Sequence, residues 1–218
     1  MSSSENELYG LVLCGGDSIR MGFDKSEIDY YGKKQKYFLY ELLEEFCDNV
    51  FISCSRFQSQ RTEPEYNVIT DVDGFENSGP MAGILSFHVE HPGKSVIVTG
   101  CDYPFINRDS IEQLINNRGK GNGKAVCFIN EVNDEYIYEP FLTVYEAPFF
   151  NTLLLNFLNK NYSLSRILEA EKVKAIVPPS DLILRNVNST DEYLEAKKLI
   201  ELMNYNFTYK HKDPDNEN

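Results

Sequence analysis

Apolar and polar positions along the chain follow two periods, and each period predicts a different kind of element. Short apolar or β-branched runs predict strands, whereas apolar residues that recur every three or four positions predict helices. Phe38, Leu42 and Phe46 show the helical spacing. The pattern predicts strands near residues 8–14, 50–54, 67–70, 95–99, 124–129, 141–145 and 174–177, and helices near residues 37–47, 80–88, 108–117, 149–158, 164–169 and 190–203. Because strands and helices alternate, we expect an α/β fold with a mostly parallel sheet.

The ends of the chain look different from its body. Residues 1–204 form one stretch without a repeat or low-complexity linker, and its size suits a single domain, while residues 205–218 are polar and are expected to be a flexible tail. Thr190 is expected to be the N-cap of the last helix. Residues 1–7 lack the basic start and apolar stretch of a signal peptide, and no apolar run reaches the length of a membrane span. We therefore expect a cytoplasmic protein without a membrane partner.

The net charge narrows the range of ligands. The 21 basic and 34 acidic side chains give a formal net charge of −13, so most of the surface repels nucleic acids. A nucleic-acid partner is therefore not expected. Any bound polyphosphate must meet local positive charge, a metal ion, or both.

Such local charge occurs in the run from Leu13 to Lys25, directly after the first predicted strand. Gly15 and Gly16 have no Cβ, so the backbone can approach a ligand closely, and free N–H groups on such a turn can face phosphate oxygens. Arg20 and Lys25 add two cations to the same loop. The strand, the glycine turn and the cations together indicate a polyphosphate site.

A carboxylate follows the central predicted strand in a comparable position. Asp102 comes just after residues 95–99, and ligands of parallel α/β sheets bind beyond the carboxyl ends of the strands. A doubly wound strand order would make this strand a neighbour of the first one, and Asp102 would then lie across from the glycine loop. Because Mg²⁺ prefers carboxylate and phosphate oxygens, we predict that Asp102 holds a Mg²⁺ ion.

Cysteine and histidine residues carry no comparable signal. Five cysteines, no C-x-x-C pair and no secretion signal argue against a disulfide scaffold, and the three histidines form no zinc pattern with them. Cys14 and Cys101 both end predicted strands and are expected to be buried core thiols. His88 and His91 are expected to be polar residues near a helix end.

The loop resembles the L-x-G-G-x-S-x-R-M-G-x-D-K signature of nucleotidyltransferases, and in particular that of the molybdenum cofactor guanylyltransferase family. Further blocks are similar to those of the same family: Asp71, Gly79-Pro80-Met81-Ala82-Gly83, Cys101-Asp102-Tyr103-Pro104, Glu139-Pro140-Phe141, Ser165-Arg166-Ile167-Leu168 and the run from Asn186 to Glu192. The resemblance covers nearly the whole chain. It implies a Rossmann-like three-layer nucleotidyltransferase fold and the transfer of GMP from Mg-GTP to molybdopterin, with release of pyrophosphate.

The resemblance also implies roles for individual residues. Catalysis would involve Arg20, Lys25 and Asp102, and Asp102 would bind Mg²⁺. The nucleotide would contact Leu13, Cys14, Gly15 and Gly16 through backbone groups, together with Lys25, Ser53, Asp71 and Asp102. Asn186 and Asn188 would bind the pterin acceptor; alternate residues of an extended segment point the same way, and an amide offers both donors and an acceptor. The function further implies transient contacts with other proteins of molybdenum cofactor biosynthesis.

Several departures from the family pattern leave two alternatives open. Cys14 stands where the family usually has Ala, Ser53 where it often has Asn, and Ser189 interrupts the N-T-P run. The family's G-K-P-L block appears as Gly32-Lys33-Lys34-Gln35, without the Pro, and Lys34-Gln35 is faintly similar to a lysine–glutamine pair of some cytidylyltransferases. The alternatives are a cytidylyltransferase of the same fold, acting on molybdopterin or on a sugar or alcohol phosphate, and a nucleotide-binding homologue without catalysis. Asn188 has an alternative role of its own, the capping of the turn before Thr190.

Overall fold

The computed structural model describes residues 7–14, 24–132 and 135–210 of the 218-residue chain. Seven strands form one mixed sheet in the order β3-β2-β1-β4-β6-β5-β7. The strands are β1 (Leu8–Leu13), β2 (Asn49–Ser53), β3 (Val68–Ile69), β4 (Ser95–Gly100), β5 (Ala125–Val132), β6 (Glu135–Tyr145) and β7 (Lys174–Ile176). The helices are η2 (Lys25–Glu27), α1 (Gln35–Glu44), α2 (Arg56–Ser59), α3 (Pro80–Glu90), α4 (Arg108–Ile115), α5 (Phe149–Leu158), α6 (Leu164–Ala170), η3 (Asp181–Leu184) and α7 (Thr190–Lys210).

The strand order reverses at β1, which lies between β2 and β4 and is parallel to both. Leu13 is in register with Ser53 on one side and with Gly100 on the other. The predicted neighbourhood of the first and the central strand is therefore confirmed, and so is the mostly parallel sheet. Strand β6 departs from it, because it runs antiparallel to both β4 and β5.

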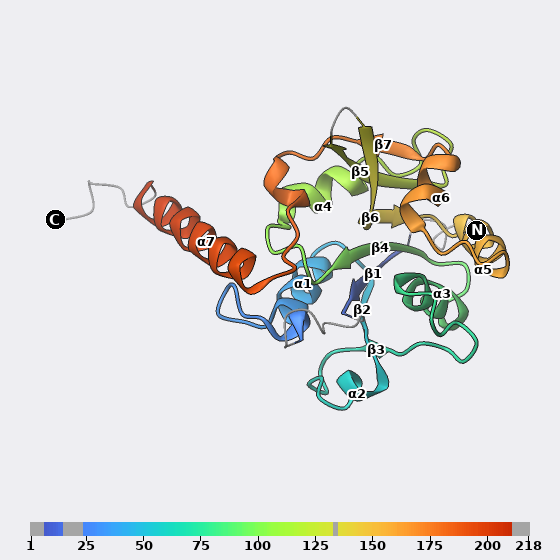
Figure 1. Cartoon of the computed structure of the whole chain (residues 1–218), viewed down its shortest axis with the longest axis horizontal. Coiled ribbons are helices and arrows are strands. Elements are labelled where there is room, and N and C mark those ends of the chain that lie inside the picture. Colours follow the sequence, from blue (N-terminus) through green and yellow to red (C-terminus); the bar gives the residue numbers. More distant parts are fainter. Residues whose placement is uncertain (1–6, 15–23, 133–134, 211–218) are drawn as a thin grey trace.

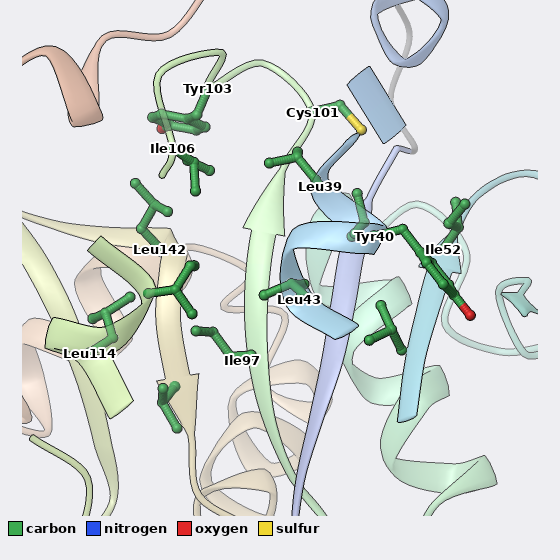
Figure 2. Packing of buried hydrophobic residues seen from close by; sticks show 14 of the residues in the cluster. Leu39, Tyr40, Leu43, Ile52, Ile97, Cys101, Tyr103, Ile106, Leu114 and Leu142 are labelled. Atoms are coloured by element: carbon green, nitrogen blue, oxygen red, sulfur yellow. The ribbon is translucent and has the colours of Figure 1, made fainter. Parts of the chain in front are cut away.

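Helices cover both faces of the sheet and give the fold its three layers. Helices α1 and α4 pack on one face and α3, α5 and α6 on the other (Figure 1). Successive residues of β1 alternate between the two cores: Val12 and Cys14 belong to the α1 side, Leu11 and Leu13 to the α3 side. Figure 2 shows the first core, in which side chains of α1 such as Leu39 meet residues of the sheet. The alternation in sequence thus becomes two separate apolar layers.

The second half of the chain differs most from the pattern. Apolar periodicity predicts that this strand starts near residue 141, but β6 begins at Glu135. The first residues of β6 are solvent-exposed and therefore show no apolar periodicity. Helix α7 continues to Lys210, beyond the predicted end at Met203, and projects from the body of the molecule (Figure 1). Neither α7 nor any other helix in the described part of the chain is long and apolar enough to cross a membrane.

The histidines of α3 serve packing, as expected of polar residues near a helix end. The His88 ring stacks on Phe150 with 4.3 Å between centroids, and His91, the C-cap, lies 4.5 Å from the ring of Phe51. Among the described residues, no group of three or more His, Cys, Asp or Glu side chains has the arrangement of a metal site. Both rings therefore belong to the core on the α3 side.

Candidate functional site

The carboxyl ends of β1, β2, β3 and β4 meet at one edge of the sheet. The ladder continues one residue past β1, because the Cys14 N–H donates to the Ser53 carbonyl at 2.8 Å and the Cys101 N–H donates to the Leu13 carbonyl at 3.2 Å. The single N–H of Cys14 is thus used by the sheet, so its backbone can offer a ligand only the carbonyl. The edge brings together residues that the sequence places far apart.

The glycine loop lies between two described segments. Gly15, Gly16 and Arg20, three of the predicted site residues, lie outside the described residues. The chain is described again from Asp24, whose carboxylate caps η2 by accepting from the Ser26 N–H at 3.0 Å. This cap fixes the backbone at Lys25, the first residue of η2.

Lys25 contacts the segment predicted to bind the acceptor. Its ammonium donates a 2.5 Å hydrogen bond to the Asn188 amide oxygen. Asn186 and Asn188 flank the buried Val187, whose N–H donates to the Asp102 carbonyl at 2.7 Å. Asn186 and Asn188 are both exposed, whereas Val187 between them is buried. The structure thus brings together Lys25, Asp102, Asn186 and Asn188.

The N-cap of α7 lies next to Asn188 but does not use the side-chain amide of that residue. The Glu192 N–H donates to the Ser189 hydroxyl at 3.3 Å, so the N-cap is Ser189, and the prediction of Thr190 is wrong by one residue. The Asn188 N–H donates to the Glu192 carboxylate at 2.7 Å. Because Ser189 fulfils the capping role, the Asn188 side chain does not cap the helix and instead accepts the hydrogen bond from Lys25.

Asp102 lies in a partly desolvated position. Burial raises the pKa of its carboxyl above the ordinary value, and the nearby Lys25 ammonium acts in the opposite direction. The carboxylate would gain from a further cation, and this fits the predicted metal role. Mg²⁺ is often held by one or two carboxylates that are supplemented by substrate phosphates.

A second carboxyl group, Glu139, belongs to the same corner and has no role in the sequence prediction. The Tyr103 hydroxyl lies between Glu139 and Asn186, donating to the carboxylate and accepting from the amide. Burial raises the pKa of Glu139 to about 7, and the charge of Asp102 adds to this effect. The E-P-F block is the signal in the sequence, but the block alone does not reveal the contact with Tyr103.

An irregularity of β6 brings Glu139 to this edge. The register between β5 and β6 shifts between Cys127 and Ile129, and such a bulge re-aims side chains. The Thr143 hydroxyl donates to the Glu139 carbonyl at 2.5 Å and so fixes the shifted stretch. Because β6 is antiparallel, residues in the middle of this strand reach the edge where the parallel strands end.

Gln58 is a further residue that the sequence prediction missed. Its side-chain N–H group donates to the Asp24 carboxylate at 2.6 Å and to the Cys14 carbonyl at 3.2 Å. It thereby joins the two described residues that flank the glycine loop. The S-x-x-Q spacing of Ser55 and Gln58 signals the capping box that fixes Gln58 on α2, but not these long-range bonds.

The nucleotide residues predicted at the other strands lie along the same edge. Ser53 ends β2 and is buried beneath α3; a Cβ on Gly83 would come within 2.3 Å of the Ser53 hydroxyl oxygen. Asp71 follows β3, and burial raises the pKa of its carboxyl, with the charge of Glu76 adding to the effect. Glycine at position 83 is therefore required for the close approach of α3 to this edge.

The lysine–glutamine pair that suggested a cytidylyltransferase has structural roles. The Lys34 ammonium forms a 2.8 Å ion pair with Glu27. Gln35 is fully buried, and its side-chain N–H group donates to the Tyr103 carbonyl at 3.3 Å. Both contacts are made to neighbours of the site residues, because Glu27 lies in η2 with Lys25 and Tyr103 follows Asp102.

Comparison with known proteins gives consistent matches. A family model described as the MobA-like NTP transferase domain matches residues 10–175. The chain is 34% identical over 195 residues to a molybdenum cofactor biosynthesis bifunctional protein of Synechocystis, covering 87% of this chain and 54% of that protein, so it spans about half the length of that relative. It is 28% identical over 184 residues to a molybdenum cofactor guanylyltransferase of Pseudomonas putida, covering 83% of this chain and 93% of that protein.

Solved structures show the same fold. Molybdopterin-guanine dinucleotide biosynthesis protein A from Archaeoglobus fulgidus superposes with a TM-score of 0.68 at 23% identity, covering 88% of this chain and 98% of the other. A CMP:2-keto-3-deoxy-manno-octonic acid synthetase in complex with CTP reaches 0.69 at 11% identity, covering 90% and 99%. At these identities the likeness concerns the fold alone, and the fold is shared by proteins with different printed activities.

Proposed function

The chain belongs to the family of MobA-like NTP transferase domains and is a nucleotidyltransferase, and on this premise we propose that it transfers GMP from Mg-GTP to molybdopterin and releases pyrophosphate. The observation that carries the proposal is the 2.5 Å hydrogen bond between the Lys25 ammonium and the Asn188 amide. It joins the lysine of the phosphate loop to the segment proposed to bind the pterin. A transfer enzyme needs such contact between its donor and acceptor sides.

The proposed chemistry asks the protein mainly to position and to neutralise. The terminal phosphate of the acceptor is already an anion, so its oxygen can attack the α-phosphorus of GTP without a general base. Lys25 would bind a phosphate of GTP and offset charge that develops as pyrophosphate leaves. On a protein of net charge −13, this local cation is essential for holding two anions side by side.

Asp102 and Glu139 are the residues that would hold Mg²⁺. Burial raises the pKa of both carboxyls, and the charge of Asp102 raises that of Glu139 further, so a cation between protein and phosphate would offset an existing electrostatic cost. When bound, the ion would supply charge stabilisation at the phosphate oxygens. Asn186 and Asn188 would orient the pterin, and Tyr103 would keep the Asn186 amide in place.

A pyrophosphate-release assay tests this function. The chain is incubated with Mg²⁺ and each of the four nucleoside triphosphates, with and without molybdopterin. We expect release with GTP only when molybdopterin is present. Release with CTP in place of GTP would identify a cytidylyltransferase, and GTP binding without any release would identify a non-catalytic homologue.

A further inference from the structure

Two free thiols meet at the centre of the sheet edge. The sulfur atoms of Cys14 and Cys101 are 2.7 Å apart, and both side chains are buried. Cys14 follows β1 and Cys101 follows β4. The pair therefore lies between the strand that leads to residue 15 and the strand that leads to Asp102.

The sheet holds this pair in position. Leu13 and Gly100 are in register, and the Cys101 N–H donates to the Leu13 carbonyl at 3.2 Å, so the backbones on either side of the pair cannot separate freely. Both thiols point into the core on the α1 side, where Figure 2 shows the Cys101 sulfur at the end of its strand. A disulfide has a sulfur–sulfur distance of about 2.05 Å, so the two atoms need to approach by only about 0.7 Å.

A third thiol lies nearby and makes the pairing a specific expectation. Cys54 follows β2, on the other side of β1, and belongs to the same core. Cys14 is therefore flanked by one cysteine on each neighbouring strand. The close sulfur–sulfur contact joins Cys14 to Cys101, which makes Cys101 the expected partner.

We propose that Cys14 and Cys101 form a redox-modification site, which a peroxide converts to a reversible disulfide. Burial and the neighbouring Cys101 raise the pKa of the Cys14 thiol well above its ordinary value, so the sulfur that loses its proton and attacks a peroxide oxygen is that of Cys101. The O–O bond breaks, and the Cys101 sulfenic acid and one water result. The second sulfur then attacks the sulfenic sulfur, the S–S bond forms, and the hydroxyl group leaves as a second water. The two thiols lose two electrons and two protons in total, and one hydrogen peroxide is reduced to two waters.

The bond would connect the two strands that border the proposed site. The Cys14 carbonyl accepts a hydrogen bond from Gln58, and the residue after Cys101 is Asp102. Oxidation would therefore fix the position of Asp102 relative to β1. The disulfide itself does not depend on the proposed function, because it is detected in the protein without any substrate.

The test uses the full chain, reduced, freed of reductant and treated with hydrogen peroxide. After digestion without reductant, mass spectrometry should find one linked peptide pair, Cys14 with Cys101, that dithiothreitol separates again. The melting temperature of the oxidised chain should rise by about 5 °C or more, since the bond closes a long loop of the unfolded chain. Both changes should be absent in Cys14→Ala and in Cys101→Ala.

Cys127→Ala is the matched control, because Cys127 is a fully buried thiol on β5 in the other core. This variant should keep both the linked pair and the rise in melting temperature. Cys14→Ala is expected to fold, since the change removes only the sulfur atom of one buried side chain. A Cys14–Cys54 link, or oxidation of single thiols without any link between Cys14 and Cys101, would overturn the proposal.

Discussion

The Lys25 ammonium donates a 2.5 Å hydrogen bond to the Asn188 side chain, although 163 positions separate the two residues. Lys25 follows the glycine loop, and Asn188 precedes the last helix. Both residues are candidates for the same reaction on independent grounds, and the fold makes them direct neighbours. Their contact allows the two sides of the site to be tested one at a time and then together.

Lys25→Ala should weaken binding of GTP. Loss of one charge-assisted phosphate contact costs about 1.5–3 kcal/mol, which corresponds to roughly a 10- to 150-fold rise in Kd. Isothermal titration calorimetry with Mg-GTP measures this Kd. Lys120→Ala is the control, because Lys120 is exposed between α4 and β5, at the opposite edge of the sheet. Equal affinities of wild type and Lys25→Ala would remove Lys25 from the phosphate site.

Asp102→Asn should abolish most turnover without lowering the melting temperature. Metal contacts contribute several kcal/mol to phosphoryl transfer, so we expect a fall of about 100-fold or more. Burial raises the pKa of Asp102 above its unfolded value, which means that the fold disfavours the charge at neutral pH; the amide removes this cost. Pyrophosphate release and thermal unfolding are measured side by side.

The exposed Asp181 provides a control for that variant, since Asp181→Asn makes the same chemical change outside the proposed site. Its rate should match that of the wild type. If Asp102→Asn kept a normal rate at limiting Mg²⁺, the metal assignment would have to be abandoned.

Asn188→Ala should impair the acceptor and spare the nucleotide. Loss of one amide contact costs about 1 kcal/mol, or roughly a five-fold loss of molybdopterin affinity, whereas the affinity for GTP should stay within about two-fold. Ser189→Ala is the contrasting variant: removal of the N-cap of α7 should cost about 1 kcal/mol of stability and leave both affinities unchanged. Titrations with each ligand and urea unfolding distinguish the two effects.

Combining Lys25→Ala with Asn188→Ala measures the contact itself. Residues in direct contact show non-additive effects, so the double variant should lose less free energy of unfolding, measured with urea, than the two single variants lose together. Strict additivity would mean that the hydrogen bond has no energetic weight in solution.

Glu139→Gln should change how stability depends on pH. The folded pKa of about 7 lies above the unfolded value, so the wild type gains stability from Glu139 at low pH and loses it as pH rises through 7. At pH 8 the glutamine variant should be more stable than the wild type, by on the order of 1–3 kcal/mol, and near pH 4 the two should agree. Urea unfolding over this pH range provides the test.

Glu135→Gln on the same strand serves as the reference, because Glu135 is exposed. Its stability curve should run parallel to that of the wild type. A Glu139→Gln curve that also ran parallel would show that the Glu139 carboxyl has the same pKa in the folded and the unfolded protein, which would contradict the prediction.

Periodicity was sufficient to predict the parallel half of the sheet. The buried runs of β1 and β4 are mainly apolar or β-branched, and the apolar spacing of α1 continues along the helix, so local signals agree with the tertiary structure. The prediction that Asp102 lies just beyond the carboxyl end of β4 rested on these local signals. The family of the chain is also confirmed by the family model that matches residues 10–175; its sequence blocks are contiguous and need no long-range contact to be recognised.

Other features depend on contacts that no local pattern contains. The early part of β6 is exposed, so its pairing with β5 leaves no apolar alternation. Helix α2 has only four residues, too few for a period, and the bonds of Gln58 reach 34 and 44 positions along the chain. Glu139 acquires its environment from Tyr103 and Asp102 on another strand end. The roles of such residues can be identified only from the three-dimensional arrangement of the strands.

The register shift of β6 brings Glu139 to its corner within a strand that is paired on both sides of it. Paired residues stand on both sides of it, Ile137 with Asn130 and Val144 with Val126. Asn188, in contrast, lies on the segment between η3 and α7, and Lys25 has a long side chain, so both side chains lose conformational entropy when they are fixed around a substrate. Substrate binding would therefore order the side chains of Lys25 and Asn188 around Glu139, which β6 already holds in place. The entropic cost of closing the site would fall on the lysine and the asparagine.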